Sequence, residues 1–436
     1  VTALQHQGSL PPVGITTQRV VCCRGYRQPY RLHRKQHISM VREKLRLREV
    51  ILLLFLLLLR SVEPLYSSPL PLDSLSHRLS IELRPAYNLV TNYEFHNHDA
   101  DGDKLYSSLS LHARYAFSFD NDSRIGSRYP TTYQGIGVAA YSFGDHNYVG
   151  TPIAIYIFQG AHITDFNDAL SLGYEWNFGY SWGWHPNVAM NSKWNVLISV
   201  ALPFTWHINP RWDISLIPDF THMSNGDTSF PNAGANLFGI RIGATRLFND
   251  QHKTTKVREY AFTDTELSSK TFGERLSYDI ILYGGWRADR FSDDNFYVIN
   301  KPHPLGGLQL QTLFHANHHF AIGASIDTQY DSSLNLYATG NNPDTDTVSI
   351  SSPSMWQQTE VGISLRGEIT APIFSVGVGF GVNLFKHGYD MSRIYTQFSL
   401  KAFITKRMFL YIGYRYNSKQ YTHNLMYGLG IRIQKR

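Results

Sequence analysis

The chain is poor in charge, in cysteine and in long apolar runs. Only 17% of its 436 residues are charged, compared with roughly 25% in ordinary soluble domains. The two cysteines, Cys22 and Cys23, are adjacent and cannot form a disulfide framework for a chain of this length. The longest apolar run, residues 50–59, is about half as long as the ~20 residues that a membrane-spanning helix needs. These shortages exclude a disulfide scaffold and a helical membrane bundle.

Aromatic residues are abundant, and the charge is unevenly distributed. The 27 Tyr and 25 Phe exclude a disordered chain, because such chains are poor in aromatic residues. Residues 1–60 hold 11 Lys or Arg against 2 Asp or Glu, and the remaining residues hold 29 against 32. The net charge of +6 therefore comes from the first 60 residues. We predict no nucleic-acid partner, because the rest of the chain is slightly acidic.

The first part of the chain has the pattern of an export signal. Met40 is followed by four basic residues, by the apolar run 50–59, and by a serine pair at 67–68. A basic head, a short apolar centre and small residues at the exit are typical of a secretory signal peptide, which we assign to residues 40–67. We expect residues 1–39 to be a misassigned upstream segment. Export predicts that periplasmic chaperones and the barrel-assembly machinery are partners.

The body of the chain alternates between apolar and small or polar residues. Between Trp194 and Ile208 every even position is apolar, and the odd positions include Asn195, Ser199 and His207. These segments exceed the five or six residues usual for strands of soluble proteins and match the ~9–11 residues of a tilted membrane strand. Their aromatic ends resemble the girdles of outer-membrane barrels. The pattern predicts an all-β, antiparallel transmembrane β-barrel in the bacterial outer membrane.

Eight segments before residue 249 and six to eight after residue 275 carry this pattern to different degrees. Eight precede residue 249: 78–88, 104–118, 132–143, 151–163, 170–181, 193–208, 210–224 and 234–248. A polar connection, residues 249–274, separates them from the additional barrel strands of residues 275–436. The clearest of these are 276–288, 306–315, 319–330, 357–368, 372–385, 393–403, 407–417 and 424–433. We predict one continuous barrel of about 14 strands. Because weakly patterned strands are hard to count, a strand number from 12 to 16 fits the pattern.

One hairpin carries a candidate catalytic group. The outward, even positions of residues 211–224 are apolar until His222 and Ser224, and Asn236 extends the outward side of the next strand. Side chains two apart on a strand point the same way, so the imidazole can reach the hydroxyl. Polar groups on a lipid-facing wall are costly unless they are paired. This favours a functional site over a simple end of the apolar stripe.

The chemistry of these residue types suggests a role for each. His222 would take the proton of Ser224, and Asn236 would orient the imidazole through its amide oxygen. The backbone N–H groups of Asn225 and Gly226 would form the oxyanion hole next to the nucleophile. Asp227, in the same loop, is the reserve candidate for the third member of the triad. No cofactor or metal is required.

The stretch 222–236, HMSNGDTSFPNAGAN, resembles the His-x-Ser-Asn motif and the following Pro-Asn-x-Gly of the lipid A 3-O-deacylases, PagL-like barrels often called acyloxyacyl hydrolases. A looser likeness extends over residues 78–248. The resemblance implies an eight-stranded enzyme that hydrolyses an ester-linked acyl chain of lipid A with a Ser–His–acid triad on its outer wall. It implies that Ser224 is the nucleophile and His222 the base. Residues after 275 have no counterpart in an eight-stranded enzyme.

Two other polar clusters do not predict a metal site. The run 97–102 begins like a calcium loop but lacks the closing Glu. His315, His318 and His319 lie in a predicted turn between strands, where a solvated turn is the better interpretation.

Three functions remain open from the sequence. The first is a serine esterase that acts on lipid A of lipopolysaccharide among the outer-membrane lipids. The second is a porin or uptake channel, because a barrel of about 14 strands can hold a lumen. The third is a structural or adhesive barrel that has lost its activity. The acyl position cleaved, the strand number and the state of the lumen are left open.

Overall fold

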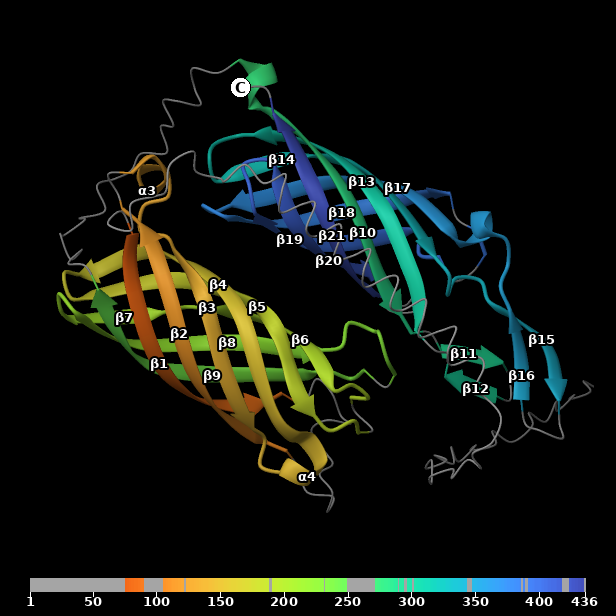
Figure 1. The fold of residues 1–436 in the computed structure, drawn as a ribbon, viewed down its shortest axis with the longest axis horizontal. Coiled ribbons are helices and arrows are strands. Elements are labelled where there is room, and N and C mark those ends of the chain that lie inside the picture. The colour runs from red at the N-terminus through yellow and green to blue at the C-terminus, as the bar shows by residue number, and fades with distance from the viewer. Residues whose placement is uncertain are drawn as a thin grey trace, which may run out of the picture. The chain divides into compact units, whose positions relative to one another are not determined.

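Two sets of antiparallel strands account for most of the structure (Figure 1). The computed structural model describes residues 75–89, 105–120, 123–187, 190–230, 232–248, 271–288, 290–293, 296–299, 302–342, 347–385, 387–388, 391–417 and 423–434. The predicted upstream segment, the signal peptide, the run 97–102 and most of the polar connection lie outside these residues. None of the helices in the described part of the chain is long and apolar enough to cross a membrane.

The first set closes into a ring, because every strand is paired on both of its edges. Its strands are β1 (Leu75–Asn88), β2 (Ser107–Phe119), β3 (Tyr133–Ser142), β4 (Gly150–Asn167), β5 (Leu170–Trp184), β6 (Trp194–Ala201), β7 (Phe204–Asn209), β8 (Trp212–Ser224) and β9 (Ala235–Phe248). The short helices α3 (Arg124–Arg128) and α4 (His146–Val149) lie between β2 and β3 and between β3 and β4. Pairing of β1 with β9 closes the ring.

Strands β6 and β7 share one place in this ring. Both pair with β5 on one side and with β8 on the other. The sequence predicts one strand over 193–208, and the structure interrupts it at Leu202 and Pro203. Proline has no N–H to donate to a neighbouring strand, so the ladder breaks there. The first ring therefore has eight strand positions.

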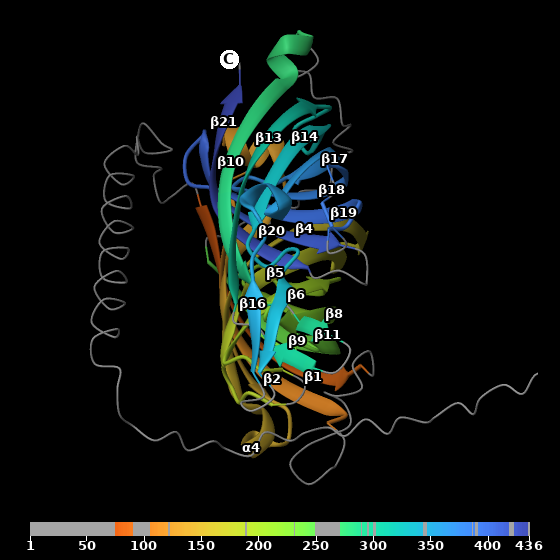
Figure 2. The ribbon, with the colours of Figure 1, turned by 90° about the vertical axis from the view of Figure 1, so that its right-hand side faces the viewer.

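The second set is a closed eight-stranded barrel. Its strands are β10 (Leu276–Arg287), β13 (His303–His315), β14 (Phe320–Asp331), β17 (Thr359–Thr370), β18 (Phe374–Phe385), β19 (Ile394–Phe403), β20 (Met408–Asn417) and β21 (Asn424–Gln434). Figure 2 shows β10, β13 and β14 following one another across its wall. Two hairpins lie outside the barrel, β11 (Arg290–Asp293) with β12 (Phe296–Ile299) and β15 (Tyr337–Asn342) with β16 (Thr347–Ser351). The 3₁₀ turns η2 (Phe272–Arg275) and η3 (Met355–Gln358) precede β10 and β17.

The prediction of an all-β antiparallel barrel is confirmed, but the arrangement differs from one continuous barrel of about 14 strands. The sixteen strand positions form two separate rings, closed by β1 with β9 and by β10 with β21. Alternation along a strand reports only which side chains face in or out. The strands that close a ring are decided by pairing between segments far apart in the sequence, and the local alternation of residues does not predict that pairing.

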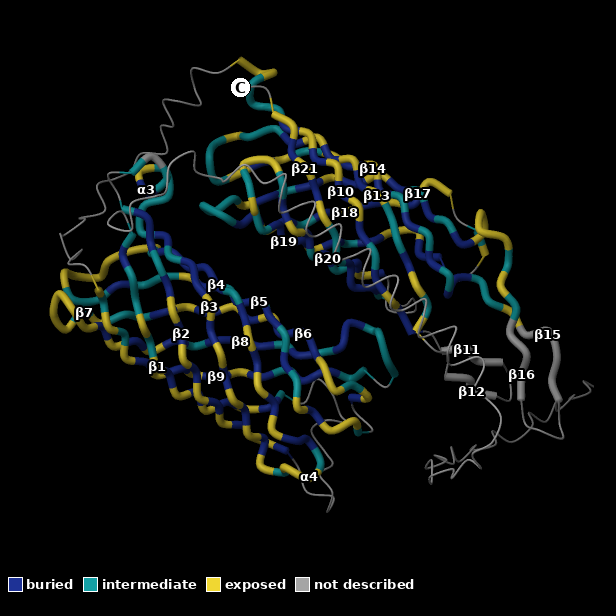
Figure 3. The backbone as a smooth tube through the Cα atoms, viewed as in Figure 1, coloured by how far each residue is buried: buried dark blue, intermediate teal, exposed yellow. Residues whose placement is uncertain are grey.

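The strands alternate between outward apolar and inward polar side chains. Along β1, β2, β8 and β9 the tube in Figure 3 changes repeatedly between exposed and buried residues. The exposed positions are mainly Leu, Ile, Val, Phe and Trp, and many of the buried ones are Ser, Asn, Gln, Asp, Glu and Arg. A soluble protein would have the opposite distribution, so the outer wall of each barrel suits an apolar surrounding.

Charged side chains fill the interior of the first barrel. Glu82 and Glu175 each accept from both Arg114 and Arg241, at 2.5–3.0 Å. Beside these pairs lies a cavity of only about 10 Å³, room for about one water molecule. Buried charges are tolerated because each has an opposite partner.

The second barrel is filled in the same way. Lys401 Nζ, which is fully buried, donates to Asp279 at 2.7 Å and also to Glu368. Arg432 donates to Asp279 at 2.7 Å, and Arg366 donates to Asp327 at 2.8 Å. In the described residues, the interior of each barrel thus holds a network of ion pairs that crosses from strand to strand.

Candidate active site

The outer wall of the hairpin β8–β9 changes from apolar to polar near its turn. Leu216 and Phe220 on β8 are 50% and 39% exposed, as expected for the outward stripe. His222 and Ser224 follow on the same face of the strand and are partly exposed. Asn236 on β9 is paired in register with His222. The antiparallel pairing therefore brings the three predicted residues to one place on the outer wall.

Hydrogen bonds join the three side chains into a chain. His222 Nε2 lies 2.9 Å from Ser224 Oγ, and His222 Nδ1 lies 2.7 Å from Asn236 Oδ1. An amide oxygen can only accept, so Nδ1 carries the proton when it bonds Asn236. In a neutral imidazole, Nε2 is then the acceptor for the Ser224 hydroxyl. The arrangement suits removal of a proton from Ser224, which is the first requirement of a serine nucleophile.

The loop after Ser224 makes a tight turn. Gly226 and Asp227 have φ angles of +65° and +63°, and Thr228 N–H donates to Asn225 O across them at 3.4 Å. Asn225 is buried, and its N–H donates to Asn232 Oδ1 at 3.1 Å. Of the two predicted oxyanion donors, Asn225 N–H is therefore already engaged. The N–H of Gly226 has no partner among the residues that the structure describes.

Asn232 supports this loop, although the sequence analysis did not identify it. Its amide oxygen accepts from Asn225 N–H, and its amide nitrogen donates to Asp227 Oδ1 at 2.8 Å. One side chain thus holds both ends of the turn beside Ser224. Both ring nitrogens of His222 already have partners, and no described hydrogen bond connects the reserve candidate Asp227 to that ring.

Gly234 is a second residue of the site that the spacing did not predict. Its φ is +70°, and a Cβ at this position would lie 3.1 Å from His222 Cε1 and 3.4 Å from Ser224 Cβ. Glycine therefore provides the close approach of the loop to the histidine and the serine. Residue spacing does not predict this close approach, although the resemblance of the Pro-Asn-x-Gly run to the family motif indicated that the segment belongs to the site.

A serine–histidine–aspartate chain also exists in the same barrel, on its inner wall. His207 Nε2 is 3.0 Å from Ser171 Oγ, and its Nδ1 is 2.9 Å from Asp213 Oδ1. Ser171 is only 5% exposed, so a bulky ester has no route to it. The bonds tie β5, β7 and β8 together near the ends of the strands. Matched hydrogen bonds alone do not make a catalytic site, and this chain provides a control for the outer one.

The described residues contain no cluster of side chains suited to binding a metal ion. No set of three His, Cys, Asp or Glu side chains there could hold a metal ion. His318 and His319 lie in the turn between β13 and β14, as predicted, and His315 ends β13. Asp213 and Asp219 face the interior of the first barrel, where Asp219 pairs with Arg84 at 2.5 Å.

Comparison with known proteins identifies a family for part of the chain. The family model described as "Acyloxyacyl hydrolase, C-terminal domain" matches residues 276–435. No curated protein matches the sequence.

Several solved outer-membrane proteins match this chain at low identity and with low TM-scores. Neisserial surface protein A is 8% identical, with a TM-score of 0.27 over 40% of this chain and 97% of that one. Omp33 of Acinetobacter baumannii is 7% identical, with a TM-score of 0.15 over 83% and 100%. The toluene transporter TbuX of Ralstonia pickettii is 10% identical, with a TM-score of 0.16 over 83% and 90%.

Proposed function

Residues 276–435 belong to the acyloxyacyl hydrolase family, and from this premise we propose that the whole chain is an outer-membrane serine esterase. It removes an ester-linked acyl chain from lipid A of lipopolysaccharide. The expected resemblance to this family is confirmed, but the matched residues form the second barrel. The hairpin motif that suggested the resemblance lies in the first. The esterase proposal therefore needs support from the first barrel itself.

That support is the hydrogen-bonded chain on the outer wall of the first barrel. Asn236, His222 and Ser224 lie in the order orienting group, base and nucleophile, at 2.7 and 2.9 Å. The outward residues around them, such as Ile198 and Phe220, are apolar and exposed. A nucleophile on such a wall meets substrates that lie in the membrane, and the acyl esters of lipid A are substrates of this kind.

The reaction is acyl transfer in two steps. Ser224 Oγ attacks the ester carbonyl carbon while His222 Nε2 takes the hydroxyl proton and passes it to the departing alcohol oxygen. Water then loses a proton to the same nitrogen and attacks the acyl carbon, and the nitrogen returns that proton to Ser224 Oγ as the acyl–oxygen bond breaks and the fatty acid leaves. The N–H of Gly226 would donate to the oxyanion that forms in each step. Asn236 keeps the imidazole in the tautomer that both steps need.

The alternative function, a porin or uptake channel, has less support. A conducting barrel needs an open polar lumen. The described interior of each barrel is crossed by ion pairs, and the cavity in the first is about 10 Å³. These features favour two filled barrels over a channel.

Mass spectrometry of lipid A from a host that expresses the chain tests the proposal. We expect loss of one acyl chain with the unmodified protein and no loss with Ser224→Ala. Ser171→Ala is the matched control, because it removes the same hydroxyl from the same kind of histidine contact, and we expect it to remain active. Unchanged lipid A alongside solute leakage would favour the channel. Equal activity of Ser224→Ala and Ser171→Ala would remove Ser224 from the catalytic role.

A further inference from the structure

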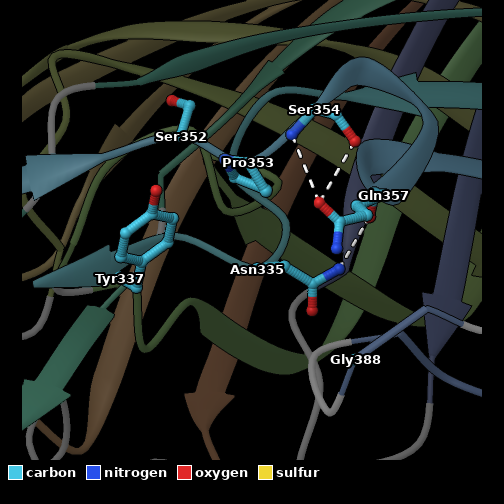
Figure 4. A pocket seen from close by; sticks show the side chains of 7 residues that line it. All are labelled: Asn335, Tyr337, Ser352, Pro353, Ser354, Gln357 and Gly388. Carbon is cyan, nitrogen blue, oxygen red and sulfur yellow. Dashed lines mark hydrogen bonds between the residues drawn. The ribbon is translucent and has the colours of Figure 1, made fainter.

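The second barrel has a cavity at the end where β14 finishes and β17 begins. Its volume is about 480 Å³, which is within the ~300–1,000 Å³ usual for small-molecule sites. Figure 4 shows its walls coming from three loop segments. The lining residues are Asn335, Tyr337, Ser352, Pro353, Ser354, Gln357 and Gly388. The candidate active site of the other barrel uses none of them.

Asn335 holds the three segments together. Its φ is +56°, and its Nδ2 donates to Gln357 O at 2.7 Å and to His387 O at 2.9 Å. Gly388 has a φ of +71°, and a Cβ there would come within 1.9 Å of Asn335 Oδ1. The glycine therefore leaves the space that the Asn335 amide occupies. The cavity is framed before any ligand enters, which lowers the entropy cost of binding.

The lining is polar but carries no charged side chain. Gln357 Oε1 accepts from Ser354 N–H and Oγ–H at 3.3 and 3.1 Å, which leaves its Nε2 to donate. This Nε2 and the hydroxyls of Tyr337 and Ser352 have no partner in the described part of the chain. An anion would find no cationic side chain in the lining, whereas neutral hydroxyl groups can both donate to and accept from these groups.

One aromatic ring is exposed beside the polar groups of the lining. Tyr337 lines the cavity and is 50% exposed. Aromatic rings pack against apolar faces while their polar tips hydrogen-bond. A pyranose ring has an apolar C–H face and a rim of hydroxyls, which matches this combination.

We propose that this cavity binds a neutral sugar residue of a cell-surface glycan. The glycan is either the oligosaccharide of lipopolysaccharide or a separate polysaccharide, since both present the same neutral hydroxyl chemistry. The inference does not depend on the esterase proposal, because it concerns other residues in another barrel.

Calorimetric titration of the detergent-solubilised full chain tests this inference. The probes are methyl glucoside, N-acetylglucosamine and glucuronic acid. We expect one of the two neutral sugars to bind with a Kd on the order of 1 mM and the anionic sugar to bind at least about tenfold more weakly, because its carboxylate lacks a cationic partner. No binding of either neutral sugar at about 100 times that concentration would overturn the inference, as would tighter binding of glucuronic acid.

Matched tyrosine variants distinguish sugar binding in the cavity from nonspecific binding of sugar to exposed tyrosine rings. Tyr337→Ala removes an exposed ring and should weaken neutral-sugar binding about tenfold without unfolding the barrel. Tyr106→Ala removes a ring that is 48% exposed just before β2 of the other barrel and should leave the Kd unchanged. Ser352→Ala removes one unpartnered hydroxyl and should weaken binding about fivefold. Equal Kd values for Tyr337→Ala and the unmodified protein would contradict the assignment.

Two further probes distinguish the sources of the glycan. If the source is lipopolysaccharide, purified lipopolysaccharide with its full oligosaccharide should compete with the monosaccharide, and lipid A alone should not. If the source is a separate polysaccharide, a soluble neutral polysaccharide should compete and lipopolysaccharide should not. Either result supports the sugar site, and competition by lipid A alone would overturn it.

Discussion

The two barrels present different side chains at corresponding positions of their penultimate strands. Near its end, β8 carries His222 and Ser224 on the outer wall, hydrogen-bonded to each other at 2.9 Å. Strand β20 carries Tyr414 and Tyr416 on the outward positions near its end. The backbone frame is similar, but only the first strand has a base beside a nucleophile. Tyrosine at such a position is typical of an interfacial girdle.

The last strands of the two barrels also differ in the residue paired with this position. Asn236 on β9 is paired with His222, whereas Leu425 on β21 is paired with Tyr414. Leucine offers no acceptor that could orient a base. The second barrel therefore has no counterpart of the orienting group either.

The family match and the candidate catalytic group thus lie in different barrels. Residues 276–435 match the hydrolase family, and the hydrogen-bonded serine belongs to residues 75–248. Fold and activity are separable, because chemistry depends on a few side chains placed on a common frame. The following predictions test whether the first barrel alone carries the activity.

Replacement of the proposed base should have the largest effect. We predict that His222→Ala lowers lipid A deacylation by about 10³-fold or more, because Ser224 loses the group that takes its proton. The measurement is the rate of fatty-acid release from lipopolysaccharide in detergent. His207→Ala is the matched control: it removes the inner hydrogen bonds to Ser171 and to Asp213 and should retain activity. Substantial activity in His222→Ala would show that the base lies elsewhere.

Replacement of the orienting amide should have a smaller effect. We predict that Asn236→Ala lowers turnover roughly ten- to a thousandfold, since the imidazole keeps its basicity but loses its fixed orientation. Asn236→Asp keeps the acceptor and adds a charge, so its turnover should be at least that of the unmodified protein. Unchanged turnover in Asn236→Ala together with an inactive Asp227→Ala would assign the third role to the loop carboxylate.

Asn232 should matter through the conformation of the loop. We predict that Asn232→Ala lowers kcat about tenfold with little change in KM, because the turn at Gly226 and Asp227 loses the side chain that joins its ends. Asn191→Ala is a suitable control, since within the described residues this amide donates to Phe230 O and makes no bond to the turn at Gly226 and Asp227. A change confined to KM would instead indicate a contact with the substrate.

Substitutions in the second barrel should have the smallest effect on deacylation. We predict that Tyr414→Ala and Tyr416→Ala change the rate less than twofold, because no base or nucleophile is lost. Both variants should still run as folded, heat-modifiable barrels in gel electrophoresis. Loss of activity in Tyr416→Ala with the barrel intact would mean that the second barrel takes part in catalysis.

Strand positions could be read from the sequence with few errors. The predicted segments 407–417 and 424–433 correspond to β20 and β21 within one residue at each end. Lipid-facing strands need an uninterrupted apolar face, so their alternation is visible in the residues themselves. The segment 193–208 was predicted as one strand, but Pro203 interrupts it. Proline breaks the hydrogen-bond ladder without disturbing the alternation of apolar residues.

The candidate site could be predicted only in part. His222, Ser224 and Asn236 share the outer face of two consecutive strands, so parity and hairpin geometry were enough to bring them together. Asn232 and Gly234 lie in the loop between those strands, where backbone angles change from residue to residue and no period exists. The inner chain was missed for another reason, because Ser171 reaches His207 through pairing of separate strands.

The sequence by itself determined where the strands lie, which face of each strand points outward, and the pairing across the β8–β9 hairpin. All three depend on residues close together in the sequence. Only the tertiary structure decided that the strands close as two rings, that ion pairs fill both interiors, and that Asn232 holds the turn beside Ser224. The first two depend on contacts between strands far apart in the sequence, and the third depends on the backbone angles of a loop that has no period. Ring closure in particular is decided by which two strand edges remain unpaired after all hairpins have formed.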